Sequence, residues 1–105
     1  MKIAALDIGG TAIKSGMVVD GVLHGFSETP TNAALGGEAV MQQAIAILHG
    51  MGDFERIGVS TAGEVDAVAG SIRLADNIPG YTGMHPKAIL TKEFGVPCLI
   101  ENDVN

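Results

Sequence analysis

A glycine-rich turn near the start of the chain holds residue types that bind phosphate groups. Gly9-Gly10-Thr11 lies between two apolar runs, and glycines allow backbone N–H groups to approach an anion closely. Thr11 can add a hydroxyl donor, and Lys14 can add a positive charge. Asp7 precedes the turn and can hold a Mg²⁺ ion through water, because that ion keeps most of its hydration shell. These residues indicate a candidate phosphate and magnesium site.

The same turn also fits a purely structural interpretation. The common phosphate signatures G-x-x-x-x-G-K-[ST] and G-x-G-x-x-G are absent, and both require a helix directly after the loop. Here the turn leads into Ala12–Val19, whose pattern predicts a strand. A plain β-hairpin with a surface lysine explains these residues, and composition alone favours that simpler interpretation.

Acidic and amide side chains gather at the end of the sequence, in Glu101, Asn102 and Asp103. Strand alternation would place Glu101 and Asp103 on the same face. Two nearby carboxylates could act as a glycosidase pair, whereas a single acceptor beside an attacking hydroxyl suits phosphoryl transfer. We favour Glu101 as a solvated acid at the end of a strand.

The sequence around these residues predicts an α/β domain built on a mixed sheet. Asp20-Gly21 between apolar runs is a strong hairpin signal, so the sheet should begin with a three-stranded antiparallel meander. Two helix–strand units follow, and their helices should pack on the sheet. The predicted elements are strands at Lys2–Asp7, Ala12–Val19 and Val22–Thr29, a helix from Glu38 to about Gly50, a strand at Ile57–Thr61, a small hairpin around Gly70, a helix at Pro86–Phe94 and a strand at Val96–Ile100.

The composition limits the classes of partner. Twelve acidic and six basic residues give a net charge of −6, which argues against a nucleic-acid surface and against an anionic membrane. No apolar run approaches the roughly 20 residues of a spanning helix. Cys98 is the only cysteine, so an internal disulfide and a cysteine-rich metal site are excluded, and a cytoplasmic setting is expected. The chain also holds 15 glycines in 105 residues, which predicts tight turns or close approach to the backbone.

Four strings, taken in order, resemble motifs of the ROK family (repressors, open reading frames and sugar kinases). That family shares the ribonuclease H-like fold of the actin-like ATPases, so the resemblance implies this fold. The strings are Leu6–Lys14, which resembles the first phosphate motif, Gly58–Asp66, which resembles a G-x-x-x-P-G-x-V-D loop, Asn77–Tyr81, which resembles an Asn–Trp sugar loop, and Glu101–Asn105, which resembles an E-N-D-A-N motif.

The resemblance implies a sugar kinase that uses ATP and Mg²⁺ and transfers the γ-phosphate to a hydroxyl of a hexose or an N-acetylated amino-sugar. Asp103 would be the catalytic base that takes the proton from that hydroxyl. The cofactor would be bound by Asp7, Gly9, Gly10, Thr11 and Lys14, with Asp7 holding Mg²⁺ through water. The sugar would be bound by Gly63, Asn77, Asn102 and Asp103.

Three positions depart from the family pattern. Ala62 replaces a usual proline, which makes the loop less rigid but removes no ligand. Tyr81 stands where many members have tryptophan, so we expect a smaller surface for stacking against sugar. Val104 replaces a usual alanine and should be neutral.

The resemblance leaves two rival classes of function. One is a sugar-sensing transcriptional regulator of the same family that lacks its DNA-binding segment here. Met1 lies six residues before Asp7, so the helix-turn-helix segment of such regulators does not fit. The other is an actin-like assembly module without catalysis, and the strings at Asn77 and at Glu101 count against it.

Residues 1–105 are expected to form the N-terminal lobe of the kinase, with the C-terminal lobe absent. The family's adenosine-binding region and its zinc motif would lie in that absent lobe. We therefore expect these residues alone to be inactive. The resemblance also implies that the full-length protein is a homodimer.

Overall fold

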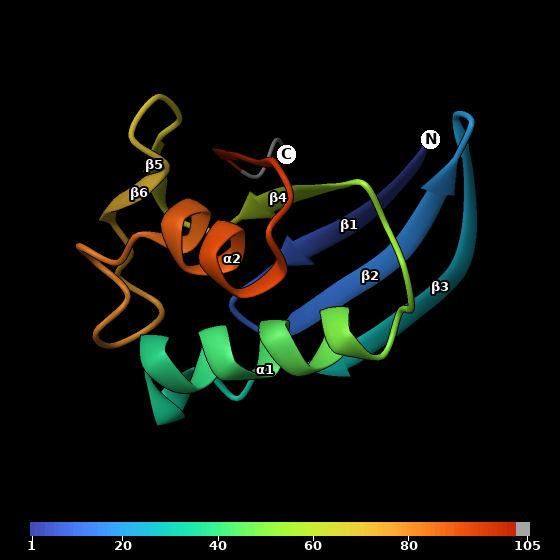
Figure 1. The fold of residues 1–105 in the computed structure, drawn as a ribbon. Helices are drawn as coiled ribbons and strands as arrows, with labels where there is room; N and C mark the ends of the chain where they lie inside the picture. The colour runs from blue at the N-terminus through green and yellow to red at the C-terminus, as the bar shows by residue number, and fades with distance from the viewer. Residues whose placement is uncertain (103–105) are drawn as a thin grey trace.

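A five-stranded mixed sheet forms the centre of the molecule in the computed structural model, which describes residues 1–102 (Figure 1). The spatial order of its strands is β3-β2-β1-β4-β7, and a separate two-stranded ribbon pairs β5 with β6. The elements, in chain order, are β1 (Lys2–Ile8), β2 (Ala12–Val19), β3 (Val22–Pro30), η1 (Ala33–Leu35), α1 (Gly37–His49), β4 (Arg56–Thr61), β5 (Glu64–Asp66), β6 (Ser71–Leu74), α2 (Pro86–Phe94) and β7 (Cys98–Asn102).

The first three strands form the predicted antiparallel meander. β1 pairs with β2 and β2 with β3, both antiparallel. The turn between β2 and β3 places Asp20 at φ 50° and Gly21 at φ 83°. Two successive residues with positive φ characterise the type I′ hairpin turn, whose twist matches that of the strands. The hairpin signal in the sequence is therefore confirmed.

β4 and β7 extend the sheet on the other side of β1, and both run parallel to it. Parallel neighbours need long crossover connections, and the connections here carry α1 and α2. α2 begins with Pro86 in its first turn and ends at Gly95, whose φ of 67° lies in the left-handed region that favours glycine at a helix end. Both ends of α2 therefore lie where the proline and glycine in the sequence predicted them.

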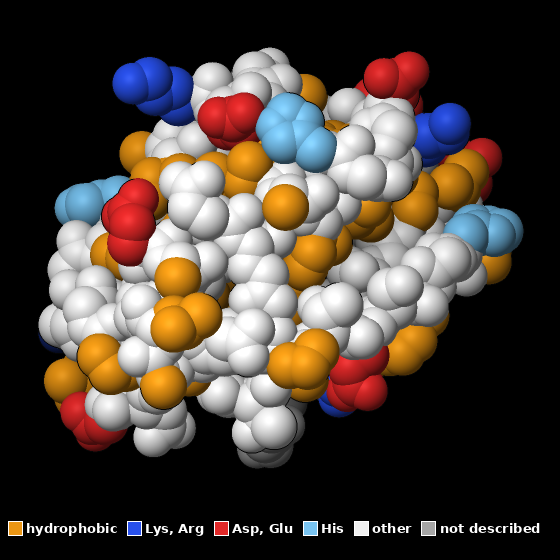
Figure 2. All heavy atoms as spheres, turned by 90° about the horizontal axis from the view of Figure 1, so that it is seen from below, with side chains coloured by type: hydrophobic (Ala, Val, Ile, Leu, Met, Phe, Trp, Pro, Cys, Tyr) orange, Lys and Arg blue, Asp and Glu red, His pale blue; other side chains and the backbone are white. Residues whose placement is uncertain are grey.

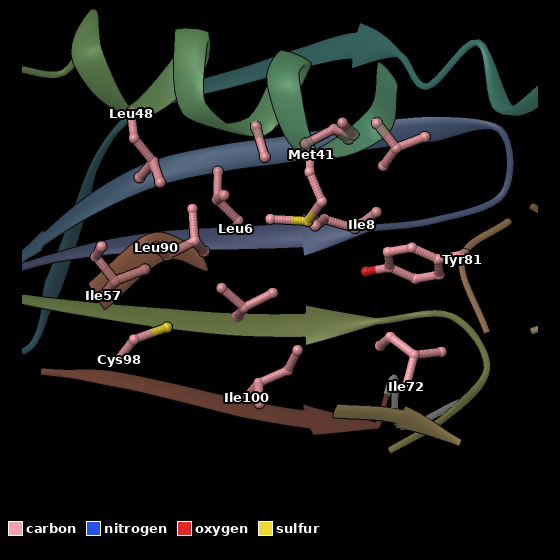
Figure 3. Packing of buried hydrophobic residues seen from close by; sticks show 14 of the residues in the cluster. Leu6, Ile8, Met41, Leu48, Ile57, Ile72, Tyr81, Leu90, Cys98 and Ile100 are labelled. Atoms are coloured by element: carbon pink, nitrogen blue, oxygen red, sulfur yellow. The ribbon is translucent and has the colours of Figure 1, made fainter. Parts of the chain in front are cut away.

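The hydrophobic core lies between one face of the sheet and the two helices (Figure 3). Alternate residues of β1, β4 and β7 point into it, as the strand period requires. The buried side of α1 packs against these strand residues, and α2 adds Leu90 to the core. The buried hydrophobic residues of these elements are Ala4, Leu6, Ile8, Val40, Met41, Ala44, Leu48, Ile57, Val59, Leu90, Cys98 and Ile100.

The opposite face of the sheet is open within residues 1–102. Ile3, Ala5, Asp7, Gly58 and Ser60 on that face are only half-buried. On β7, Leu99 is 63% exposed. Two of the predicted site residues, Asp7 and its register partner Lys14, lie on this open face near one end of the sheet.

The outer surface beside α1 is of mixed character. Figure 2 shows hydrophobic side chains scattered among polar groups on the face seen from below, and the lysine and arginine side chains there lie apart from one another. Within residues 1–102, no helix is long and apolar enough to cross a membrane.

Several boundaries differ from the sequence prediction by one or two residues, and the largest difference is in β7. β7 runs from Cys98 to Asn102 instead of covering residues 96–100, because its pairing with β4 continues as far as Thr61. Glu101 and Asn102 therefore belong to the strand and do not follow it. The small hairpin around Gly70 forms as predicted, with Val65 opposite Ile72.

Candidate functional site

Three parallel strands end at one edge of the sheet, at or next to predicted site residues. Ile8 of β1 pairs with Thr61 of β4, and Thr61 pairs with Asn102 of β7. The carboxyl ends of three parallel strands are therefore level with one another. In open α/β sheets this edge is where ligands bind.

The glycine loop joins β1 to β2 and exposes backbone donors. The N–H of Gly9 donates to the carbonyl oxygen of Ala12 at 2.9 Å, which closes the turn. The N–H groups of Gly10 and Thr11 donate to no protein group within residues 1–102. Thr11 is exposed and Gly10 half-buried, so both N–H groups are available to an anion.

Thr31, which follows β3, fixes the shape of this loop. Its hydroxyl donates to the carbonyl oxygen of Gly9 at 2.8 Å, and its N–H donates to the carbonyl oxygen of Thr11 at 2.9 Å. Thr31 is only 1% exposed, so its side chain is committed to this contact. Sequence reasoning missed Thr31, because a threonine after a strand carries no signal of a partner 22 residues away.

Asp7 lies on the open face of the sheet between Lys14 and Ser60, which are its partners in register on β2 and β4. The hydroxyl of Ser60 donates to Oδ1 of Asp7 at 2.9 Å. Asp7, Lys14 and Ser60 line a hollow of about 280 Å³, which Leu23 and Phe26 close on one side. Sequence reasoning singled out Asp7 and Lys14 but not Ser60.

Asn77 lies beside the glycine loop. A Cβ atom added to Gly10 would lie 3.6 Å from Cβ and 3.8 Å from Nδ2 of Asn77. The loop that carries Asn77 is attached to the start of α1, where the N–H of Gly37 donates to the carbonyl oxygen of Pro79 at 2.7 Å. The structure therefore brings together two predicted site residues that are 67 positions apart in the sequence.

Asn102 makes an internal contact at the end of β7. Its Oδ1 accepts a hydrogen bond from the N–H of Val65 at 2.7 Å, which ties β7 to β5. The amide acceptor is thus engaged within the protein, and the Nδ2 donor is the part of the side chain left for a ligand. Glu101, its neighbour, is the register partner of Ser60 on the open face.

Gly63 is the second residue of the connection from β4 to β5, and its surroundings explain why the residue is glycine. Its φ is 94°, and an added Cβ would lie 2.5 Å from the carbonyl oxygen of Leu74 and 3.0 Å from Cβ of Ala75. A side chain at this position would collide with the end of β6. Glycine is therefore required at position 63, because the loop before β5 packs closely against the end of β6.

Tyr81 does not offer the stacking surface expected from the sequence. Its side chain is fully buried and points into the core beside Ile8 and Ile72 (Figure 3). Its hydroxyl hydrogen-bonds to Oγ1 of Thr61 at 2.9 Å. Burial raises the pKa of Tyr81, while the contact with Thr61 acts in the opposite direction. The expectation of a smaller sugar-stacking surface at this position was wrong, because the ring fills the core.

Several further residues complete the account of the site. Asp103, the predicted catalytic base, lies outside the described residues. Cys98 is buried in the core, and burial raises the pKa of its thiol to about 11, so the thiol is a packing group and not a nucleophile. Within residues 1–102, no group of three or more histidine, cysteine or acidic side chains is arranged to hold a metal ion.

The arrangement combines the groups that a phosphate-binding site needs. The backbone donors of Gly10 and Thr11 lie at the turn, with Asp7 on the strand before it and Lys14 on the strand after it. An amide side chain, Asn77, stands next to the turn. The edge can thus hold an anionic group, a hydrated cation and a polar ligand close to one another.

The fold defines the class of protein. An antiparallel meander extended by parallel strands beyond β1, with crossover helices on one face, is the ribonuclease H-like fold of the actin-like ATPases. A scan against models of known protein families finds no match. The comparisons with individual proteins are more specific.

Several of the similar proteins are sugar kinases. A beta-glucoside kinase of Listeria innocua is 35% identical over 108 residues, covering 100% of this chain and 36% of that protein. The crystal structure of the ROK hexokinase from Thermus thermophilus matches with a TM-score of 0.87 and 34% identity, over 100% of this chain and 36% of the other. The ROK-family glucokinase from Streptomyces griseus, solved with glucose and AMPPNP, has a TM-score of 0.87 and 28% identity, over 100% and 34%. Over its whole length, the chain is similar to the N-terminal portion of ROK-family sugar kinases.

The chain spans about 36% of the length of the curated beta-glucoside kinases that it matches. It corresponds to the N-terminal portion of these proteins.

Proposed function

We propose that the full-length protein is a sugar kinase that uses ATP and Mg²⁺, and that residues 1–105 are its N-terminal lobe. Its reaction would transfer the γ-phosphate to a hydroxyl of a hexose or an N-acetylated amino-sugar. The observation that most supports this proposal is the proximity of Gly10 and Asn77: a Cβ atom added to Gly10 would lie 3.6 Å from Cβ of Asn77, so the glycine turn lies beside a polar loop. A kinase needs its two substrates in such proximity, because phosphoryl transfer depends mainly on positioning and charge neutralisation.

The phosphate groups of ATP would bind at the glycine loop. The free N–H groups of Gly10 and Thr11 would donate to phosphate oxygens, and Gly9 would allow the tight approach. The hydroxyl of Thr11 and the ammonium group of Lys14 would add a donor and a charge. Because Thr31 already holds the loop carbonyls, these donors would be oriented before the nucleotide binds.

Asp7 fits a magnesium ion that is bound through water. Its carboxylate lies on the open face, one oxygen accepts from Ser60, and hard oxygen atoms are the ligands that this cation prefers. When bound, Mg²⁺ would neutralise charge on the phosphate oxygens. Asp7 would hold the water shell of that ion in place.

The sugar would bind where Asn77, Gly63 and Asn102 surround the edge of the sheet. The amide of Asn77 can donate to and accept from sugar hydroxyls, whereas Asn102 has its Nδ2 donor free and its acceptor engaged. Asp103 would accept the proton of the attacking hydroxyl as general base. That assignment rests on the resemblance of the E-N-D string to the family motif.

The experiment that tests the proposal is a coupled ATP assay of the full-length protein with a panel of hexoses and N-acetylhexosamines. Asp103→Asn should lower kcat by at least about 100-fold, because a positioned general base contributes roughly that much or more. Affinity for the sugar, measured by calorimetry, should be retained. Asp53→Asn, at an exposed position in the loop between α1 and β4, is the matched control and should leave kcat unchanged.

Two outcomes would contradict the proposal. Absence of turnover with every sugar of the panel would refute the proposed sugar kinase activity. An unchanged kcat in Asp103→Asn would place the general base at another residue.

A further inference from the structure

The open face of the sheet carries a row of four polar side chains at one level. Asp7 is the register partner of Lys14 on β2 and of Ser60 on β4, and Ser60 is the register partner of Glu101 on β7. The row therefore crosses four adjacent strands next to the glycine loop. Ser60 occupies its middle, between two acidic residues.

Ser60 is the protein donor that holds the carboxylate of Asp7. Its Oγ lies 2.9 Å from Oδ1 of Asp7. Within residues 1–102, no ion pair joins Lys14 to Asp7 at 4.0 Å or less. The hydroxyl of Ser60 therefore determines the orientation of the carboxylate and leaves Oδ2 of Asp7 free to accept from another donor.

This hydrogen bond is not required by burial. Both side chains are only half-buried, so water could satisfy either group if the other were removed. Ser60 also lines two hollows of about 280 Å³ each, one shared with Asp7 and Lys14 and one shared with Glu101. A serine that contacts open space on both sides contributes little to the packing of the sheet. What the Ser60 hydroxyl does for the site is to fix the orientation of the Asp7 carboxylate.

We propose that Ser60 is a positioning residue for the magnesium site. By donating to Oδ1 of Asp7, it aligns Oδ2 with the water shell of a Mg²⁺ ion that accompanies the nucleotide. This inference rests on the proposed function, because it assigns Ser60 a part in the same site. It predicts that Ser60 strengthens binding of the nucleotide only when Mg²⁺ is present.

Calorimetric titration of the full-length protein with AMPPNP, in Mg²⁺ and in EDTA, tests this inference without measuring activity. The ratio of the two affinities is the magnesium-dependent gain. Ser60→Ala should reduce that gain by at least about tenfold, since hydrogen bonds to a charged group are worth about 1.5–3 kcal/mol and 1.4 kcal/mol corresponds to a factor of ten. Affinity in EDTA should stay unchanged.

Three further variants separate positioning from folding. Ser60→Thr keeps the hydroxyl in a residue that suits a strand, and it should retain the gain. Ser60→Cys keeps the shape but has only a weak donor, so it should lose most of the gain. Ser27→Ala is the matched control, because Ser27 lies on the exposed strand β3 and outside the hollow around Asp7.

The outcomes distinguish the inference from the function on which it rests. A wild-type protein whose affinity for AMPPNP does not depend on Mg²⁺ would refute the proposed magnesium site, and the inference with it. A normal gain in the wild-type protein that Ser60→Ala and Ser60→Cys both keep would refute the role of Ser60 alone. Loss of the gain in Ser60→Thr as well as in Ser60→Ala would also overturn it, because the hydroxyl would not be the cause.

Discussion

Gly63 and Gly83 form a natural pair for testing whether close packing fixes the loop after β4. Both residues are exposed and have nearly the same positive φ, 94° and 89°. They differ in their surroundings. An added Cβ would lie 2.5 Å from the carbonyl oxygen of Leu74 at Gly63, and it would meet nothing within 4 Å at Gly83. Replacement by alanine therefore puts a Cβ on a backbone of positive φ at both positions and causes a collision at only one.

The expected losses of stability follow from this difference. Gly83→Ala should lower the free energy of unfolding by about 1–2 kcal/mol, which is the strain of a left-handed backbone for a residue with a Cβ. Gly63→Ala should lose a further 1–3 kcal/mol or so, because the Cβ overlaps a backbone atom that cannot rotate away. In this variant the loop between β4 and β5 must shift, and the nearby hydrogen bond from the N–H of Val65 to Oδ1 of Asn102 should weaken.

Urea denaturation of both variants, followed by circular dichroism, measures these losses. The difference between the two variants isolates the collision, because the strain is common to both. Equal losses of stability in the two variants would refute the reasoning, and so would a smaller loss in Gly63→Ala.

Two further predictions concern the core. Tyr81→Phe should lower the free energy of unfolding by about 1 kcal/mol, since it removes one buried hydrogen bond to Thr61. In urea denaturation, Thr61→Val should then have a smaller effect in the Tyr81→Phe background than alone; additive losses would contradict the coupling. Burial raises the pKa of Cys98 from 9.0 to about 11, so the folded state keeps a proton that the unfolded chain releases, and stability should fall as pH rises from about 9 to 11. Thermal unfolding between pH 8 and 10 should therefore show a flatter decline for Cys98→Ala than for the wild-type protein, and parallel declines would count against this assignment.

The elements of the fold were predictable because their signals are local. Asp20-Gly21 specifies its hairpin through the conformations of two adjacent residues, and Pro86 and Gly95 mark both ends of α2. The hydrophobic stripe of the first helix gave its position, and α1 begins one residue before the predicted start at Glu38. Such features depend on residues within one or two turns of each other.

The connections within the site were not predictable in the same way. Ser60 and Asp7 are 53 residues apart, and Thr31 and Gly9 are 22 residues apart. The partner of such a hydroxyl can be predicted only when the order and register of the strands are known. The environment of Tyr81 was misjudged for a related reason, because an aromatic residue in a turn-rich string can either face a ligand or fill the core.

Every residue of the edge strand β3 is exposed, and this strand ends at the residue before Thr31. Segments with so few buried contacts open at a lower free energy than the core does, as native-state hydrogen exchange measures. When β3 detaches, the carbonyls of Gly9 and Thr11 lose the donors that Thr31 supplies. Order in the glycine loop is therefore thermodynamically linked to the pairing of a strand at the rim of the sheet. If the loop binds phosphate as proposed, a partner that covers β3 or a change that detaches it would alter the affinity for phosphate without contacting the loop.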